Sequence, residues 1–375
     1  MLKLISQGAF GCVFHPGLDC NDSIENKEKK LTKIQVSNIY SKNEIDIGLQ
    51  LSQFDKNYLY FLPVVSKCNI NLNKLNANTA LNFKEEFKKC KIRREEDSKL
   101  VGMTIPYLKS ITFQDILNNQ NISYKIVSII EIYKYLLTGL DLLWTQRIIH
   151  YDFKLNNIIF TNDTTSPRII DFGLSIPFDK ITDDTIRNYF YIYAPRWHVW
   201  CLDIHLLNYL LHEHTGDVLD LEACELVADE FVIHSLIYSK SSIQEFNRYK
   251  VKCKNYTGQF ANKSKKYVID NILKYANTWD NYSLSHLYIT IINSCFRNTN
   301  STFIKMWKQL LYTNIDPDPK NRITTSQSIN IFNDLFYLDT DVFSLKKTKQ
   351  EFKQNEKQSV QDMNDLVKKS KETPK

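Results

Sequence analysis

The sequence of 375 residues predicts an α+β fold, with a small β-rich lobe carrying one helix and a larger, mainly helical lobe after it. Two observations support this prediction. Short apolar runs separated by turns fill the first hundred residues, and apolar residues with helical spacing dominate from Asp115 onward. We expect the first lobe at residues 1–108, with a polar insertion near 69–98. The second lobe is expected at 109–340, with a helical insertion near 197–277.

Five local patterns predict the elements of the small lobe. Residues 2–14 are typical of a strand, a glycine-bearing turn and a second strand, and residues 31–36 favour another strand. Residues 43–54 carry isolated apolar side chains among polar ones, which is typical of a helix with one packed face. A β-like run covers 58–65, and a further apolar strand covers 100–108.

The larger lobe begins with its clearest helix. Residues 124–144 are apolar on most faces, which indicates a buried helix. Two short β-like segments follow at 157–160 and 168–170, and the chain is then mainly helical to about residue 338. Residues 341–375 form a basic tail with few large apolar side chains, which we expect to be disordered.

The charge of the chain does not favour a nucleic-acid partner. The net charge is +6, from 48 basic and 42 acidic residues. Residues 346–375 hold nine Lys and five acids and so contribute +4, which leaves +2 for residues 1–345. So small a charge does not indicate a nucleic-acid surface. Because no uncharged apolar run reaches about 18 residues, we also expect no membrane span.

The cysteines favour a reducing compartment. They form no C-x-x-C pair, so we expect reduced thiols, with neither a zinc site nor a disulfide framework. No N-terminal signal is visible, which favours a cytoplasmic location. The eight cysteines are at positions 12, 20, 68, 90, 201, 224, 253 and 295.

The strongest chemical signal is the sequence HYDFKLNN at residues 150–157, followed by DFG at 171–173. Phosphoryl transfer from ATP requires Mg²⁺ held by oxygen ligands, and a group that orients and deprotonates the acceptor hydroxyl. Asp152 is the candidate base, and Lys154 is the candidate partner of the transferring phosphate. The candidate metal ligands are Asn157 and Asp171.

These motifs resemble the catalytic loop H-R-D-x-K-x-x-N and the D-F-G sequence of eukaryotic-type protein kinases. The resemblance extends upstream through GLDLLWTQRII at residues 139–149. It implies a bilobal protein-kinase-like fold, protein substrates, ATP, and Mg²⁺ with Mn²⁺ as an alternative. The position of Lys154 three residues before Asn157 resembles serine/threonine kinases rather than tyrosine kinases.

The N-terminal hairpin looks like the glycine-rich loop of the same family, G-x-G-x-x-G-x-V, whose backbone amides cover the phosphates. Gly8 and Gly11 match the pattern, and Ser6 stands where the first glycine is expected. We therefore expect weakened rather than abolished contact with the nucleotide. The candidate ATP-binding residues of this hairpin are Ile5, Ser6, Gln7, Gly8, Ala9, Phe10, Gly11, Cys12 and Val13.

Two further ATP-binding residues are assigned by the resemblance. Lys33 is the candidate for the strand lysine that binds the α- and β-phosphates. Glu44, eleven residues later, is the candidate for its helix partner. The adenine hinge is expected near residues 103–107.

Several positions depart from the family. Arg196 replaces the acid of A-P-E, so Arg322 in DPDPKNRIT lacks its usual partner. Two aspartates compete for the position that supports the catalytic loop from below. Asp203 is closer to A-P-R in the chain, but Asp280 matches the family motif better and is favoured. Tyr151 replaces an arginine that receives an activation-loop phosphate in many family members.

Three functional classes remain open. The retained residues Asp152, Asn157 and Asp171 favour an active serine/threonine protein kinase. A pseudokinase scaffold and a small-molecule phosphotransferase of the aminoglycoside or choline type are the alternatives. The F-G-C-V-F-x-P turn, the long insertions and the Asn/Ile/Lys-rich composition further resemble the protein kinases of large nucleocytoplasmic DNA viruses.

Overall fold

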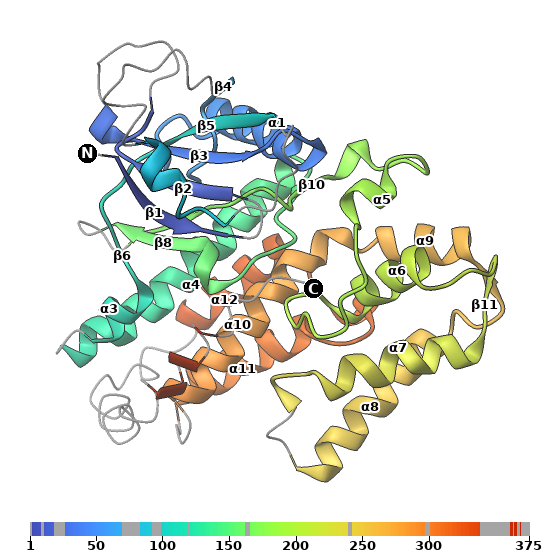
Figure 1. Ribbon diagram of the computed structural model, residues 1–375. Helices are drawn as coiled ribbons and strands as arrows, with labels where there is room; N and C mark the ends of the chain where they lie inside the picture. Colours follow the sequence, from blue (N-terminus) through green and yellow to red (C-terminus); the bar gives the residue numbers. More distant parts are fainter. Residues whose placement is uncertain are drawn as a thin grey trace. The chain divides into compact units, whose positions relative to one another are not determined.

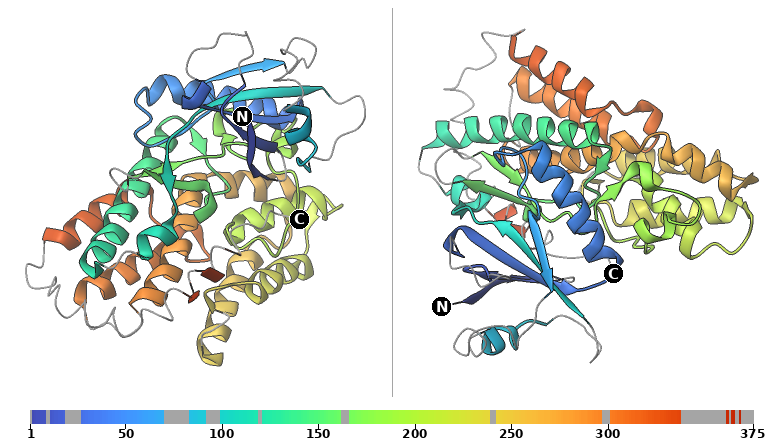
Figure 2. Two further views of the ribbon diagram at one scale, coloured as in Figure 1. Left: turned by 60° about the vertical axis from the view of Figure 1, so that its left-hand side comes forward. Right: turned by 90° about the horizontal axis from the view of Figure 1, so that it is seen from above.

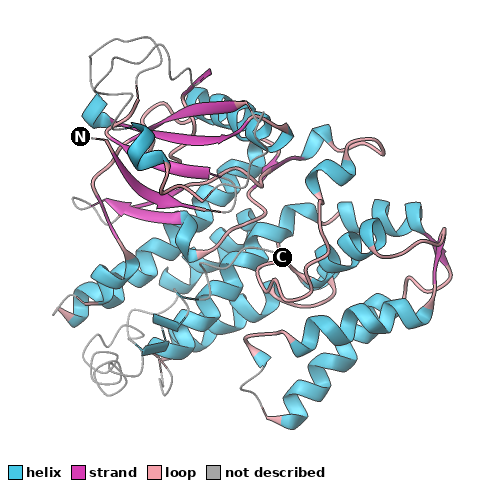
Figure 3. Ribbon diagram, in the orientation of Figure 1, coloured by secondary structure: helices cyan, strands magenta, loops and turns pink. Residues whose placement is uncertain are grey.

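The computed structural model divides the chain into two compact units. The first contains Met1–Ile111 and Ile159–Ser175, and the second contains Thr112–Ile158 and Ile176–Lys375. Figure 1 labels their elements, and Figure 3 distinguishes helices from strands. The structure describes residues 2–8, 11–18, 27–69, 83–91, 99–118, 121–161, 166–238, 242–296 and 301–337, with residues 361, 362, 364, 365 and 368 of the tail.

The first unit is built on an antiparallel sheet of five strands in the order β1-β2-β3-β5-β4. The strands predicted within residues 2–14, 31–36 and 100–108 are confirmed. The strands are β1 Lys3–Gln7, β2 Gly11–His15, β3 Lys30–Val36, β4 Ser66–Asn69 and β5 Leu100–Pro106.

One face of this sheet packs on helix α1, Ile39–Phe54, which confirms the helix predicted at 43–54. Asn38 begins the helix, since its side chain accepts hydrogen bonds from the amides of Tyr40 and Ser41 in a capping box. Ile45 of α1 belongs to a buried cluster with Met103 of β5. Because side chains alternate along a strand, the other face carries a different set of residues.

That opposite face carries a second apolar cluster. It contains Cys12 and Phe14 of β2, Ile34 of β3, and Phe83. Phe83 opens a short helix, residues 83–87, inside the region that the sequence marks as a polar insertion. The remaining members of the cluster are Leu2 and Leu18.

The β-like run predicted at 58–65 is wrong. Its residues make one isolated bridge, Phe61 with Ile169, and the strand β4 comes only afterwards. The cause is Asp55, whose carboxylate accepts the backbone amides of Leu59, Tyr60 and Phe61 at 2.7–3.1 Å. Amides held in this way cannot join a ladder.

Two short strands predicted before the DFG sequence, at 157–160 and 168–170, are confirmed. They are β8 Ile158–Thr161 and β9 Pro167–Ile169, which form a three-stranded sheet with β6 Ser110–Ile111 in the order β6-β8-β9.

The second unit is mainly helical. Helix α4, predicted at 124–144, spans Ile122–Thr145. Tyr133 at its middle lies edge-on against Tyr288, Trp307 and Phe332, with ring centroids 4.8–5.1 Å apart. These rings join α4 to α10 Trp279–Cys295, α11 Thr302–Asn314 and α12 Thr325–Tyr337. Helix α12 packs along α4 in all views (Figures 1 and 2).

The segment that the sequence marks as a helical insertion is folded into four helices, of which α7 packs against α8. They are α6 Leu202–His212, α7 Leu221–Ile233, α8 Ile243–Gly258 and α9 Lys265–Leu273. The shorter elements of this unit are α3 Phe113–Leu117, α5 Ile186–Tyr189, the strand pair β7 Ile148–Ile149 with β10 Ile176–Pro177, and the pair β11 Val218–Leu219 with β12 Lys263–Ser264.

Two further expectations concern membrane spans and the basic tail at residues 341–375. Among the described residues, no helix has both the length and the apolar character needed to cross a bilayer. Most of the tail at 341–375 lies outside the described residues.

The expectation that every cysteine is a reduced thiol is wrong. Cys12 and Cys90 form a disulfide, and Cys68 is also disulfide-bonded. The fold brings the Cα atoms of Cys12 and Cys90 to 6.0 Å, a spacing that a disulfide spans. Cys201, Cys224, Cys253 and Cys295 are buried and are not disulfide-bonded.

Candidate active site

Lys33 lies at the centre of a charged group in the first unit. Its Nζ atom is 2.7 Å from Oε1 of Glu44 and 2.7 Å from Oδ1 of Asp171. Strand β3 positions the lysine, α1 carries the glutamate, and Asp171 follows β9. The structure therefore brings together three candidate site residues that are up to 138 positions apart in the sequence.

Burial and charge set the protonation of this group. Burial acts to lower the pKa of Lys33, but the charges of Asp171 and Glu44 outweigh it and raise the pKa overall. Burial raises the pKa of Glu44, and the positive charge of Lys33 opposes that rise. Lys33 is consequently held in its charged form between the two carboxylates.

Gln35 is a member of this group that the sequence analysis missed. Its Nε2 atom donates a 2.5 Å hydrogen bond to Oε2 of Glu44, so the two oxygens of that carboxylate accept from two different β3 residues. Lys33 and Gln35 are two positions apart and so point to the same face of the strand. That spacing was the available signal, but glutamine at this position matches no motif.

The first residue of β2, Gly11, lies very close to β3. The amide of Gly8 donates to the carbonyl of Gly11 at 2.9 Å. A Cβ atom at Gly11 would lie 2.8 Å from Cγ of Gln35 and 3.0 Å from the Ile34 carbonyl oxygen, so only glycine fits there. Ala9 and Phe10, also expected to bind ATP, lie outside the described residues.

The other hairpin residues differ in what they present. Val13 is paired with Lys33 across the sheet and shares its face. The side chain of Cys12 points to the opposite face of the sheet, where it is bonded to Cys90. It is therefore directed away from the face that carries Lys33. Ile5, Ser6 and Gln7 are exposed on β1, where a register shift interrupts the pairing between Leu4 and Ser6.

The second unit contains the catalytic-loop residues. Lys154 Nζ is 3.0 Å from Oδ2 of Asp152, and both side chains are almost fully buried. The side-chain amide of Asn157 donates to the carbonyl and to Oδ2 of Asp152, at 2.8 and 3.0 Å. Lys154 also lies over the ring of Trp197, with Nζ 4.7 Å from its centroid. The loop thus fixes Asp152 from two directions, and Trp197 is a neighbour that no motif indicated.

Asp280 supports this loop from α10. Its carboxylate accepts the backbone amides of His150 and Tyr151 at 2.7 and 3.0 Å, which confirms the preference for Asp280 over Asp203. Burial raises the pKa of Asp280 to about 6, although the two amides oppose the shift.

Asp203 has a different role, which also explains the departure at Arg196. It accepts from Nη2 of Arg322 at 2.7 Å, in an ion pair with no exposed surface on either side chain. The indole of Trp279 donates to its other oxygen at 2.6 Å. Helix α6 therefore supplies the carboxylate that A-P-R cannot.

Tyr151 fills the position of the family's phosphate-binding arginine with an aromatic core residue. Its hydroxyl accepts from Nδ2 of Asn208 at 2.9 Å. Its ring packs against those of Trp200 and Phe190, with centroids 4.8 and 5.6 Å away. A buried phenol cannot bind a phosphate as a guanidinium does.

Oxygen donors for a divalent ion are present in each unit. The side chain of Asp171 is 48% exposed despite its ion pair. The amide nitrogen of Asn157 is occupied within the loop, which leaves the carbonyl oxygen as the donor that a cation would take. A carboxylate and an amide oxygen suit Mg²⁺, which binds few protein ligands and keeps several of its own waters or phosphates. Within the described residues, no cluster of three His, Cys, Asp or Glu side chains could hold a metal ion.

Three comparisons show which known proteins this chain is similar to. A family model described as protein kinase domain matches residues 71–332. Mitogen-activated protein kinase kinase kinase 8 of Rattus norvegicus is 41% identical over 56 residues, which are 15% of this chain and 11% of that protein's length. The autoinhibited serine kinase domain of the giant muscle protein titin is 13% identical, with a TM-score of 0.42, over 94% of this chain and 86% of that one.

The match to the family model covers the catalytic loop, the DFG sequence and Asp280, but begins after Lys33 and Glu44. Those two residues lie outside the matched range, and the structure shows them as an ion pair in the first unit. With a β-sheet lobe, a helical lobe and a family match over more than two thirds of its length, the chain belongs to the protein kinase domain family.

Proposed function

We propose that this protein is an active, ATP-dependent kinase that phosphorylates Ser and Thr hydroxyls of protein substrates. The observation that carries the proposal is the ion pairing of Lys33 with both Glu44 and Asp171, each at 2.7 Å. In the kinase family, the strand lysine must pair with the helix glutamate for the phosphates of ATP to be aligned. In this structure, Lys33 and Glu44 form such an ion pair.

Each candidate residue has a role in the proposal. The hairpin amides and Lys33 bind the phosphates of ATP, and Asn157 with Asp171 bind Mg²⁺. A bound divalent ion neutralises charge on the phosphates during transfer. Asp152 accepts the proton of the acceptor hydroxyl, and Lys154 stabilises the phosphoryl group as it moves.

The alternatives have less support. A pseudokinase typically lacks the base, the metal aspartate or the strand lysine, whereas all three are present and their side chains are held by specific contacts. A small-molecule phosphotransferase usually lacks the DFG sequence and the lysine arrangement of residues 152–157. The ion pair of Lys154 with Asp152 at 3.0 Å supports Ser/Thr acceptors. The viral resemblance and the cytoplasmic location stay predictions.

The test is an assay with radiolabelled ATP and Mg²⁺. Casein, a basic protein, small amino-alcohols and sugars are offered in parallel, and labelled protein is hydrolysed to identify the phosphoamino acid. We expect phosphoserine or phosphothreonine on protein and no label on the small molecules. The control is Asp152→Asn, which should lower turnover by roughly 10²–10⁴-fold with an unchanged circular dichroism spectrum, the usual effect of losing a positioned base. Label on a small molecule alone, or none anywhere, contradicts the proposal.

A further inference from the structure

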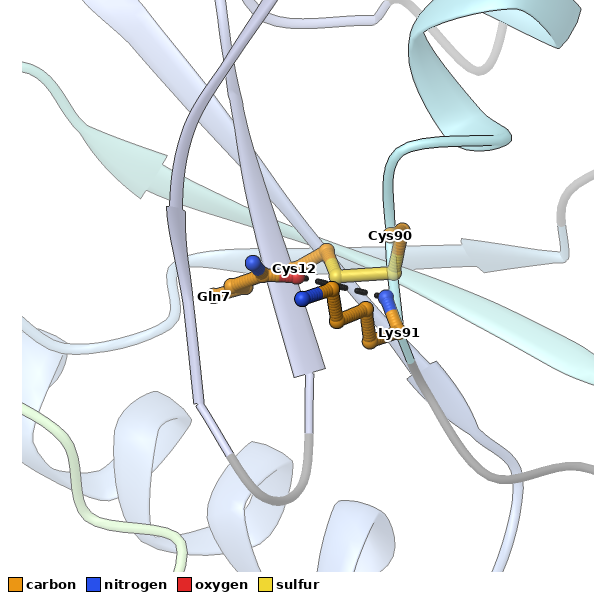
Figure 4. The surroundings of a disulfide bond; sticks show 4 residues. All are labelled: Gln7, Cys12, Cys90 and Lys91. Atoms are coloured by element: carbon orange, nitrogen blue, oxygen red, sulfur yellow. Dashed lines mark hydrogen bonds between the residues drawn. A yellow bond between two sulfur atoms is a disulfide. The ribbon is translucent and has the colours of Figure 1, made fainter. Parts of the chain in front are cut away.

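Residues 83–91, which we call the strap, are fastened to the hairpin formed by β1 and β2. Cys90 at the end of the strap is bonded to Cys12 of β2, 78 positions earlier. Beside this disulfide, the backbone amide of Lys91 donates to Oε1 of Gln7 at 3.2 Å (Figure 4). One covalent bond and one hydrogen bond thus join the strap to both strands at the end of the hairpin that carries the glycine turn.

The strap also covers the open edge of the sheet. β1 is the terminal strand of the sheet that the described residues form, and the amides on its outer side have no strand partner among them. The Leu4 amide instead donates to Oε2 of Glu86 at 3.0 Å. This hydrogen bond is the first cause of the lowered pKa of Glu86, and Lys89 of the strap pairs with the same side chain. A charged carboxylate therefore holds the edge strand.

Aromatic packing completes the attachment. Phe83 and Phe87 of the strap stack on each other with centroids 5.2 Å apart, and lie 5.9 and 6.2 Å from the ring of Phe14 on β2. Phe14 and Phe83 are fully buried. The strap is therefore packed on the hairpin, and the disulfide is one part of a larger contact.

The strap lies on the face of the sheet opposite to Lys33. Cys12 is paired with Ile34 and Val13 with Lys33, so Cys12 and Val13 point to opposite faces. Cys12 belongs to the cluster that contains Phe83, whereas Val13 shares the face of Lys33. The strap can therefore influence a nucleotide on the Lys33 face only by fixing the position of the hairpin.

We propose that the strap holds the hairpin in position for ATP, and that the Cys12–Cys90 disulfide makes this positioning dependent on redox state. The second part rests on the proposed kinase function. A loop that covers phosphates binds them more tightly when its flanking strands are already fixed in position, because the cost of ordering it is then not part of binding. When the disulfide is broken, ATP binding must again include the cost of ordering the hairpin, and it becomes weaker. If the hairpin is in its binding-competent position one time in ten, the dissociation constant for ATP rises about tenfold.

The chemical step is a two-electron reduction by a dithiol. A thiolate of the reductant attacks the sulfur of the half-buried Cys90, and the sulfur–sulfur bond to Cys12 breaks. The second thiol of the reductant then displaces Cys90. The products are the two protein thiols, after uptake of the two protons released by the reductant, and one disulfide in the reductant.

The experiment compares oxidised protein with protein treated with dithiothreitol, and mass spectrometry confirms the state of Cys12 and Cys90. Two properties are measured: amide hydrogen exchange of peptides covering β1 and β2, and the dissociation constant for ATP by calorimetry. We expect reduction to speed exchange in both strands and to raise the dissociation constant about tenfold. Cys90→Ser should show both changes without reductant, and should not respond to it further.

Two variants separate the strap from other effects. Cys68→Ser removes the other disulfide-bonded cysteine among the described residues, and should keep the response to dithiothreitol. Glu86→Ala, in oxidised protein, should speed exchange at Leu4 while leaving the disulfide intact. Exchange and ATP affinity that stay unchanged on verified reduction overturn the proposal, as does loss of the response in Cys68→Ser. Faster exchange with no ATP binding in either form supports the role of the strap in holding the hairpin and contradicts the kinase function.

Discussion

Gln35 shows how a residue outside the known motifs can complete a site. It donates to one oxygen of Glu44 while Lys33 binds the other. Gln35→Met keeps the length of the side chain and removes the donor, which leaves a buried carboxylate oxygen without this bond. Hydrogen bonds to charged groups contribute about 1.5–3 kcal/mol, so kcat/KM for ATP should fall about 10- to 100-fold.

The measurement is steady-state kinetics with ATP varied, beside a thermal melt of each variant. Gln53→Met, at an exposed position of α1, the helix that carries Glu44, is the matched control and should leave kcat/KM unchanged. Wild-type kcat/KM in Gln35→Met would show that Lys33 alone holds Glu44.

Trp197 contacts the catalytic loop through the face of its ring, 4.7 Å from Nζ of Lys154. Desolvated cation–π contacts contribute up to about 2 kcal/mol. Trp197→Leu should therefore lower kcat by about 5- to 30-fold. Trp197→Phe keeps a smaller aromatic face, so its kcat should lie between those of Trp197→Leu and wild type. KM for ATP should not change in either variant. An equal loss of kcat in the Leu and Phe variants would mean that Trp197 acts only by filling space.

At the level of elements, local patterns predicted most strands and helices because each depends on neighbours in the sequence. The strand prediction at 58–65 failed because Asp55 accepts hydrogen bonds from three amides of this run. The pattern of apolar residues does not reveal such a contact. The prediction of reduced thiols failed at Cys12 and Cys90 for a related reason. The two cysteines are 78 residues apart, and they meet where residues 83–91 pack on the hairpin of β1 and β2. The candidate Lys33–Glu44 pair and Asp280 were found because family spacing encodes those tertiary contacts.

Helix α6 supplies a structural element that the family motifs do not contain. Asp203 at its start neutralises Arg322 in a fully buried pair, and also accepts the indole hydrogen bond of Trp279, the neighbour of Asp280. Asp203→Asn leaves the arginine charge buried without its counterion. Breaking such a pair costs about 3–5 kcal/mol, so the urea midpoint should fall sharply.

The double variant Asp203→Asn with Arg322→Met removes both charges, and should recover part of the stability lost by Asp203→Asn alone. This double-mutant comparison isolates the charge. If the double variant is as unstable as the sum of the two single variants, the ion pair makes no coupled contribution and the helix is held by packing.

At the scale of the whole molecule, buried histidines make the free energy of unfolding depend on pH. Burial lowers the pKa of His205 to about 4 and that of His286 to about 3, while an unfolded histidine titrates near 6.5. Both are neutral in the folded protein and bind protons more readily when unfolded. Their contribution is therefore complete above about pH 6.5 and is lost as the pH falls, by roughly 1.4 kcal/mol per pH unit for each histidine.

Asp280 acts in the opposite direction. Burial raises its pKa to about 6, so the folded protein binds this proton before the unfolded chain does, and protonation stabilises the fold below pH 6. These two histidines and Asp280 together contribute a net loss of about 1.4 kcal/mol per pH unit between pH 6 and 4. Urea unfolding at a series of pH values should show this slope. His286→Gln removes one histidine, so its stability should fall by about 1.4 kcal/mol less per pH unit than that of wild type over the same interval; a variant with the wild-type slope would show that His286 does not titrate on unfolding.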